Sequence, residues 1–225
     1  MNEAMPTVFA RFEEFPLTAR PRPVILLEDP ARIGDRGFVD ADAKNAWLDG
    51  AIEPAVPLAA GILDLLTGGR RPDGDITPLT ITASSPVTQS FRCDRGGRRL
   101  PAYRLTITGM PQPVIVIDPT VDIWWPPTGA LATTVQDSGW AYIADHGRTL
   151  QIPASGGFLT RFHGAEFDEH ETYVVGRAIT SRRTTTATAI PLSRIGTRVT
   201  GRLQNPLGDR VLLRSDGHPL GVRRM

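Results

Sequence analysis

The sequence predicts a mainly β protein: an antiparallel sandwich, or one to two small OB-like or cupin-like barrels, with a short helical segment near the N-terminus. Gly 22 and Pro 20 make up about a fifth of the 225 residues, too many helix breakers for a helical bundle. From residue 76 onward, about twelve short runs rich in Val, Ile, Thr and aromatic residues follow one another, and turn residues separate most of them. Because no segment of helical period lies between these runs, the pattern favours antiparallel sheets over βαβ units.

We expect three segments along the chain. Residues 1–22 form an N-terminal arm, because "PLTARPRP" has the proline-rich composition of an extended linker. Residues 23–75 contain a strand and a helical segment. Residues 76–225 form an antiparallel β region, within which residues 150–222 can be a separate small barrel. The loop "TGGRRPDGD", residues 67–75, is the best candidate for an internal boundary.

The helical segment follows the buried strand "PVILLEDP". Asp40 or Asp42 is expected to cap a first helix, which Gly50 ends. Pro57 suits the first turn of a second helix. These signals predict two short helices before residue 67.

Two later strands share the pattern V-x-G-R, in "YVVGRAI" (173–179) and "RVTGRLQ" (198–204). Convergence on strand chemistry explains this similarity better than duplication. Glycine inside a strand is nevertheless unfavourable unless the backbone bends or another group approaches closely. We therefore expect bulges or tight barrel curvature at Gly176 and Gly201.

Composition restricts the class of protein. The formal net charge is +1, which does not favour nucleic acid as a partner. Cys93 is the only cysteine, so no disulfide can form within the chain. The N-terminus does not have the pattern of a secretory signal, and no apolar run approaches the length of a membrane helix. We expect a cytoplasmic protein that binds a protein partner or forms a homo-oligomer, with no membrane association.

The stretch "FHGAEFDEHETYVVGRA", residues 162–178, collects histidines and carboxylates before a strand-like run. Residues i and i+2 of a strand share a face, and residues i, i+3 and i+7 of a helix align. Either geometry can present a His–carboxylate set for acid/base catalysis or for a divalent transition metal. The catalytic candidates are His163, Glu166 and Asp168; the metal-ligand candidates are His163, Glu169 and His170. The favoured interpretation is a solvated acidic loop leading into a strand, with no cofactor.

The same stretch resembles the first cupin motif. Gly157, His163, Glu169 and Gly176 have the spacing of that motif, but Ala165 occupies the place of its second histidine. The second cupin motif has no counterpart. The resemblance implies a barrel and a metal-dependent small-molecule enzyme, although the ligand set is incomplete.

Two further groups are candidates for binding. Adjacent strand residues face opposite ways, so one of Trp124 and Trp125 is expected in the core and the other outward, where it can stack on a partner. The arginines of "FRCDRGGRR" are expected on a hairpin that turns at the paired glycines, and they can bind anionic groups. They are Arg92, Arg95, Arg98 and Arg99.

The phrases "AKNAWLDGAIE", "LPAYRLTITG", "IDPTVDIWWPP" and "EFDEHETYVVGRAI" resemble an uncharacterised family of actinobacterial proteins. This resemblance implies nothing about mechanism. The leading hypothesis is a non-catalytic β-rich binding or assembly module for a protein partner. The alternative is a cupin-like metal-dependent or acid/base enzyme that uses His163 and the neighbouring carboxylates.

Overall fold

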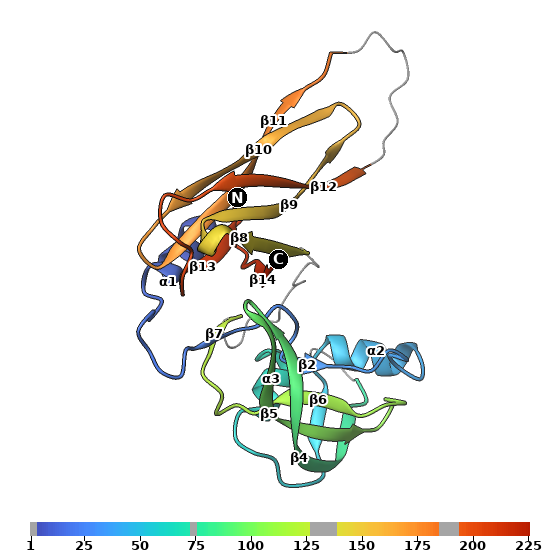
Figure 1. Ribbon diagram of the computed structural model, residues 1–225. Coiled ribbons are helices and arrows are strands. Elements are labelled where there is room, and N and C mark those ends of the chain that lie inside the picture. Colours follow the sequence, from blue (N-terminus) through green and yellow to red (C-terminus); the bar gives the residue numbers. More distant parts are fainter. Residues whose placement is uncertain (1–3, 73–75, 127–138, 185–193) are drawn as a thin grey trace. The chain divides into compact units, whose positions relative to one another are not determined.

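The computed structural model describes the chain except residues 1–3, 73–75, 127–138 and 185–193 (Figure 1). It confirms a mainly β fold with few helices. The chain forms two compact units, each assembled from separate segments. The first unit comprises residues 1–22, 94–96 and 136–225, and the second comprises residues 23–93 and 97–135. The expected boundary loop at 67–75 therefore lies inside the second unit, and residues 150–222 lie inside the first.

The second unit is built on a five-stranded sheet in the order β2-β6-β5-β4-β3. Its strands are β2 (Ala31–Arg32), β3 (Ile52–Pro54), β4 (Leu79–Cys93), β5 (Gly96–Ile107) and β6 (Val114–Ile117). A separate pair joins β1 (Val24–Ile25) to β7 (Ile123–Trp125) in parallel. Strands β4 and β5 are adjacent and turn at Gly96, whose φ of 102° suits glycine, which confirms the expected hairpin.

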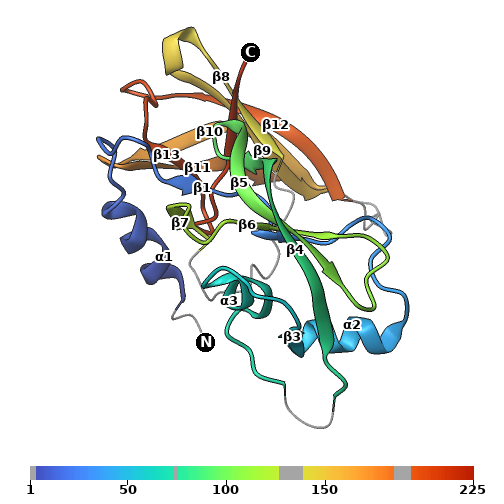
Figure 2. The same cartoon turned by 90° about the horizontal axis from the view of Figure 1, so that it is seen from below.

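Two short helices lie beside this sheet in Figure 2: α2 (Ala41–Leu48) and α3 (Ile62–Thr67). The Asp40 side chain caps α2 by accepting a hydrogen bond of 2.8 Å from the backbone N–H of Ala43, as predicted. The second helix begins at Ile62, not near Pro57. Gly61 has a left-handed φ of 86°, so a helix begun at Pro57 could not run through it.

The first unit contains α1 (Ala4–Glu13) and two sheets, in the orders β12-β9-β8-β14 and β10-β11-β13. The strands are β8 (Trp140–Ala144), β9 (Thr149–Gly157), β10 (Thr160–Glu169), β11 (Tyr173–Arg182), β12 (Arg194–Arg202), β13 (Val211–Arg214) and β14 (Gly221–Arg224). Strand β10 packs beside β12, and a bridge between Leu213 and Pro219 connects β13 to the segment before β14. The two sheets therefore form a partly closed barrel.

The β region was expected to be antiparallel, but two of its strand pairs are parallel. Strands β13 and β14 pair in parallel with β11 and β8 respectively, whereas β8–β9, β9–β12 and β10–β11 are antiparallel. The core of this barrel is aliphatic and includes Leu150, Val174 and Leu212. Helix α1 belongs to the same unit: Phe12 and Phe15 are buried, and the ring of Phe9 stacks on Tyr173 at 6.2 Å.

Candidate binding surface

The acidic half of the 162–178 stretch forms most of a strand, so the prediction of a solvated loop there is wrong. Strand β10 spans Thr160–Glu169 and pairs with β11. The register shifts between Phe162 and Gly164, where Gly164 has φ of +147°. This bulge changes the parity of the strand, so that Phe162, Ala165 and Phe167 all pack against the core of the barrel. A strict two-residue alternation could not place these three side chains on one face, which is why the pattern is hard to recognise in the sequence.

The polar candidates of β10 lie on its exposed side and form separate pairs with nearby groups. His163 Nε2 lies 2.6 Å from Ser181 Oγ on β11. Glu166 forms an ion pair of 2.6 Å with Arg177, which is its cross-strand neighbour. Asp168 Oδ2 lies 3.4 Å from Nε2 of His170, the residue that follows the end of β10. These side chains are held in cross-strand and local pairs, so the structure does not bring them together around one point.

The metal-ligand candidates are separated in the same way. His163 contacts Ser181, and the His170 ring stacks on Tyr173 with centroids 4.2 Å apart. Glu169 forms an ion pair with Arg210 at 3.1 Å. Across the described part of the chain, no group of three or more His, Cys, Asp and Glu residues could hold a metal ion. The cupin-like spacing therefore coincides with a strand and its bulge rather than with a converging ligand set.

Glu169 fixes the segment that follows β12. Its carboxylate accepts hydrogen bonds from the backbone N–H groups of Gln204 and Asn205, at 2.5 and 3.2 Å, and from Arg210. Burial alone would raise the pKa of Glu169, but these donors outweigh it, so the pKa lies below its ordinary value. Glu169, the residue at the cupin-like position, therefore holds Arg210 and the backbone after β12 in place.

The tryptophan pair was expected to have one ring in the core and one outward, and the structure differs from this. Trp124 and Trp125 are both half-buried, so neither is a clear core or outward residue. Strand β7 pairs in parallel with the short β1, and the backbone N–H of Leu26 donates to the Trp125 carbonyl at 2.7 Å. A strand covered partly on both faces leaves both rings partly exposed.

The four candidate arginines belong to different units. Arg92, Arg98 and Arg99 lie in the second unit, and Arg95 lies in the first. Arg92 donates to the Leu27 carbonyl at 3.0 Å. Arg95 donates to the carbonyls of Gly208 and Arg210 at 2.9 and 2.5 Å, and burial lowers its pKa despite the nearby Asp94 carboxylate. Arg92 and Arg95 thus bind backbone carbonyls within their own units.

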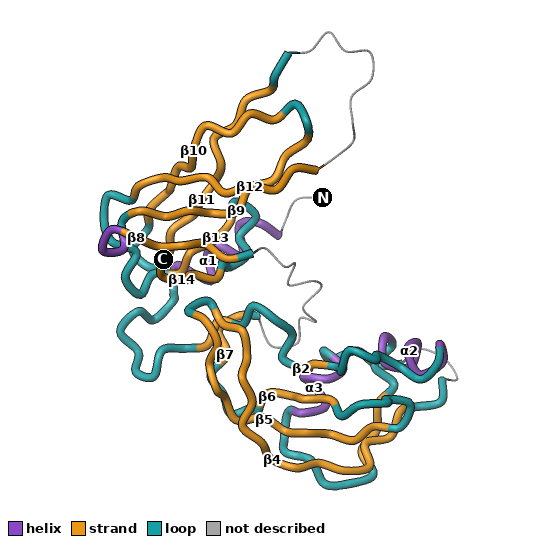
Figure 3. Tube along the Cα trace, turned by 45° about the vertical axis from the view of Figure 1, so that its right-hand side comes forward, coloured by secondary structure: helices purple, strands orange, loops and turns teal. Residues whose placement is uncertain are grey.

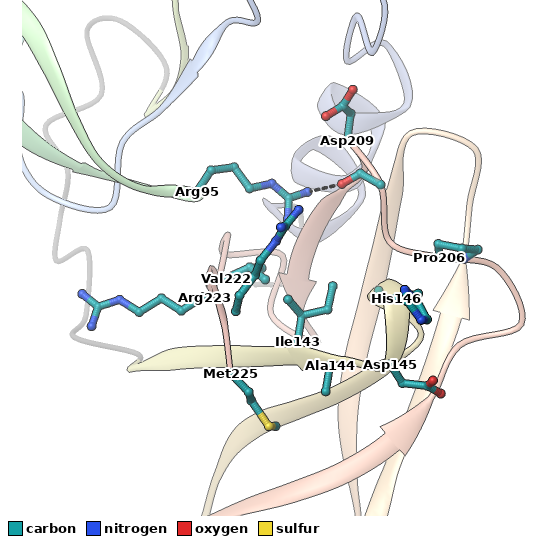
Figure 4. A pocket seen from close by; sticks show the side chains of 13 residues that line it. Arg95, Ile143, Ala144, Asp145, His146, Pro206, Asp209, Val222, Arg223 and Met225 are labelled. Carbon is teal, nitrogen blue, oxygen red and sulfur yellow. Dashed lines mark hydrogen bonds between the residues drawn. The ribbon is translucent and has the colours of Figure 1, made fainter.

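A pocket of about 990 Å³ in the first unit was not foreseen from the sequence (Figure 4). It is lined by β8, β14, the loop at 206–209 and the short 3-10 turn η1 (Asp145–Gly147). Asp145 and His146 both have left-handed backbones, with φ of 51° and 52°. This conformation is costly for residues other than glycine. The lining residues come from four separate parts of the chain, at Arg95 and within 143–147, 206–209 and 222–225, so no single run of sequence indicates the pocket.

Apart from Met225 at the last position, the exposed large apolar side chains among the described residues of the first unit lie at the far ends of β9, β10, β11 and β12. These strand ends extend beyond the barrel core (Figures 1 and 3). Phe158 lies in the turn between β9 and β10, Ile179 on β11 and Ile195 on β12, with exposed fractions of 49%, 42% and 41%. We call these strand ends, from Ala154 to Gly164, from Ile179 to Arg183 and from Ile195 to Arg198, the distal surface.

The distal surface is also basic. Arg161, Arg182 and Arg183 are exposed, and within the described part of the chain none of them forms an ion pair. Arg161 and Arg182 lie at the end of the β10–β11 ladder, opposite Ser181 and Thr160. This surface has no clear signal in the sequence, because the two-residue alternation ends there and both faces of the strands are exposed.

Comparisons with protein-family models, with curated proteins and with solved structures find no match to this chain. Among the described residues, no helix is both long and apolar enough to cross a membrane. The functional argument therefore depends on the surfaces themselves.

Proposed function

We propose that the chain is a non-catalytic, β-rich binding or assembly module for a protein partner, and that the partner binds the distal surface. The observation that carries this proposal is the exposure of Phe158, Ile179 and Ile195 on strand ends that extend past the barrel core. Large apolar side chains gathered on a projecting element are typical of protein interfaces.

The composition of the distal surface supports a protein partner. Arginine and aromatic residues are enriched at protein interfaces, and the distal surface contains Phe158 together with the exposed Arg161 and Arg182 at the end of the β10–β11 ladder. Burying one apolar side chain of this size contributes about 1.5–3 kcal/mol. Three such side chains, each already partly covered, could supply much of the binding energy of a moderate interface.

The backbone around this surface favours recognition without a large ordering cost. Strands β9 to β12 are paired along most of their length, and Arg183 N–H donates to the Leu159 carbonyl at 2.7 Å. A surface held by such ladders loses little conformational entropy when it binds. This rigidity supports a docking role for the strand ends.

The test is a capture experiment with lysate of the organism that encodes the protein. The bait variants are the wild type, the distal variant Phe158→Ser/Ile179→Ser, and the control Ile33→Ser. Ile33 is similarly exposed, at 38%, but lies in the second unit. We expect the same protein partner on the wild type and the control, reduced at least about tenfold on the distal variant. Equal capture by all three baits would reject the distal surface as the binding site.

A further inference from the structure

The four-stranded sheet of the first unit, β12-β9-β8-β14, carries charge of one sign (Figure 1). Its strands contain five arginines, three on β12 and two on β14, and no acidic residue. The formal net charge of the whole chain is +1, so these strands are far more basic than the chain as a whole. A local basic region, rather than the net charge, is what attracts an anionic partner.

The alternation of side chains separates an inner face of this sheet from an outer one. Ala141, Leu150 and Val199 belong to the core of the barrel. Because successive side chains of a strand point to opposite faces, the residues next to these three point outward. The pairing of the strands then places one outward residue of each strand in a row across the sheet: Thr200, Gln151, Tyr142 and Arg223. We call this side of the sheet the outer face.

Two arginines of the outer face lie over its aromatic rings. Arg223 Cζ lies 3.9 Å from the centroid of the Trp140 ring, and Arg198 Cζ lies 4.8 Å from that of Tyr142. Both arginines are exposed, and among the described residues neither forms an ion pair. The cation–π contact orders each guanidinium on a half-buried ring. The N–H groups of these guanidiniums can bind an anion such as phosphate.

The nearest acidic side chain to follow these strands already has a partner. Asp145, directly after β8, forms an ion pair of 3.5 Å with Arg202 on β12. Within the described strands of the sheet, no carboxylate therefore offsets the charge of Arg198 and Arg223. The charge of the outer face is complementary to an anionic partner.

The chemistry of the outer face favours a single-stranded nucleic acid over a protein as this anionic partner. Its outward positions, in the four strands that the structure describes, hold no Val, Ile, Leu, Met or Phe. A protein partner would find no aliphatic patch to bury at the centre of an interface. Unpaired bases, by contrast, stack on aromatic rings and on guanidinium planes, while arginine N–H groups bind the phosphates.

We propose that the outer face binds single-stranded nucleic acid, with bases stacked on the Trp140–Arg223 and Tyr142–Arg198 pairs and phosphates bound by the two arginines. This is a second binding function beside the proposed protein partner, on a face that adjoins the distal surface at Arg198. The bases of a duplex are stacked on one another and cannot reach these pairs, so a duplex should bind weakly.

The test is fluorescence anisotropy with labelled oligo(dT) and oligo(U) of about 12 nucleotides, a length within the site size of small single-strand binding barrels. A DNA duplex and inorganic polyphosphate serve as unlabelled competitors. The charge variant is Arg198→Gln/Arg223→Gln, and the ring variant is Trp140→Leu/Tyr142→Leu, which keeps apolar bulk beneath the arginines. Near-UV circular dichroism checks that each variant is folded.

The matched control is Arg161→Gln/Arg182→Gln. It removes the same charge as the charge variant from two exposed arginines of the same unit, on the β10–β11 ladder. Because these positions belong to the distal surface, the control also separates the two proposals. It should bind the oligonucleotides nearly as tightly as the wild type.

We expect the charge variant and the ring variant each to bind at least about tenfold more weakly than the wild type. In a plot of log affinity against log salt, the slope of the charge variant should be smaller by about 1.4, because two phosphate contacts are lost. Stacking should also quench tryptophan emission in the wild type, and the quenching should be smaller in Trp140→Leu. Tighter binding of either probe supports the proposal and identifies DNA or RNA as the preferred strand.

Four results would overturn the inference. The first is a wild type that binds neither oligonucleotide at low salt, and the second is a control that weakens binding as much as the charge variant. The third is polyphosphate or duplex that displaces the probe as well as an unlabelled single strand does, because base stacking would then contribute nothing. The fourth is a ring variant that binds like the wild type. None of these results bears on capture of a protein by the distal surface.

Discussion

The guanidinium of Arg22 holds the carboxylate of Asp94 in a two-pronged ion pair, with Nη1–Oδ1 at 3.1 Å and Nη2–Oδ2 at 2.8 Å. The Asp94 side chain is 3% exposed and that of Arg22 is 17% exposed. Arg22 also lies over the Phe15 ring, 4.8 Å from its centroid. A buried carboxylate needs such a partner, because an uncompensated charge in the interior is very costly.

Replacement of Asp94 by Asn should therefore destabilise the first unit strongly. The change leaves the Arg22 guanidinium without its counter-charge in a mostly buried position. We expect the free energy of unfolding to fall by about 3 kcal/mol, measured by urea denaturation. The matched control is Asp209→Asn, because the Arg20–Asp209 pair is 3.5 Å long and 67%/57% exposed. That control should change stability by less than about 0.5 kcal/mol, and equal losses would refute the special role of Asp94.

The two V-x-G-R strands differ in how strictly they require glycine. A Cβ on Gly201 would overlap the Ala165 carbonyl oxygen and lie 2.7 Å from the Phe167 ring. A Cβ on Gly176 would lie 3.1 Å from the same ring. Gly201→Ala should thus cost about 2–3 kcal/mol, because backbone and ring must both move. The control Gly196→Ala lies on the same strand with nothing near its Cβ position, so it should be neutral or slightly stabilising.

These glycines show how far the sequence could predict the fold. Glycine inside a strand indicated bending or close approach, and both positions are close approaches. The responsible group, Phe167, could not be identified, since it lies on β10, and the sequence suggested a loop there. The bulge at Gly164 reverses the face of every later residue, and a one-residue shift of this kind depends on the partner strand. Strand content was therefore predictable, whereas register was not.

The Glu169–Arg210 contact should make the stability of the first unit depend on pH. The pKa of Glu169 is lowered in the folded protein, so its contribution is present above the ordinary glutamate pKa of about 4.3 and is lost as pH falls through the lowered value. Glu169→Gln should be less stable than the wild type at neutral pH. It should also lose less stability between about pH 5 and pH 3. Urea midpoints at several pH values measure both effects, and parallel pH profiles would contradict the assignment.

The candidate site was harder to predict than the fold, for a physical reason. His163, Glu166 and Asp168 were catalytic candidates because they are close in sequence, but His163 and Glu166 pair with Ser181 and Arg177 on β11. Cross-strand pairs depend on register, which hydrophobic pattern alone leaves open at an exposed strand end. The exposure of Phe158 likewise has no signal in the sequence, because a single phenylalanine does not indicate whether it is buried. Only its place in a turn beyond the core makes it part of a surface.

The cap of α2 provides the last prediction. The Asp40 carboxylate accepts a hydrogen bond from Ala43 N–H at 2.8 Å, satisfying one of the first free donors of the helix. Asp40→Ala should destabilise the second unit by about 1 kcal/mol. Asp42→Ala, within the first turn, removes only a favourable dipole interaction of about 0.3–1 kcal/mol, and the helix propensity of alanine offsets part of it. Urea denaturation of the two variants should therefore show the larger loss for Asp40, and the reverse order would mean that Asp40 is not the effective cap.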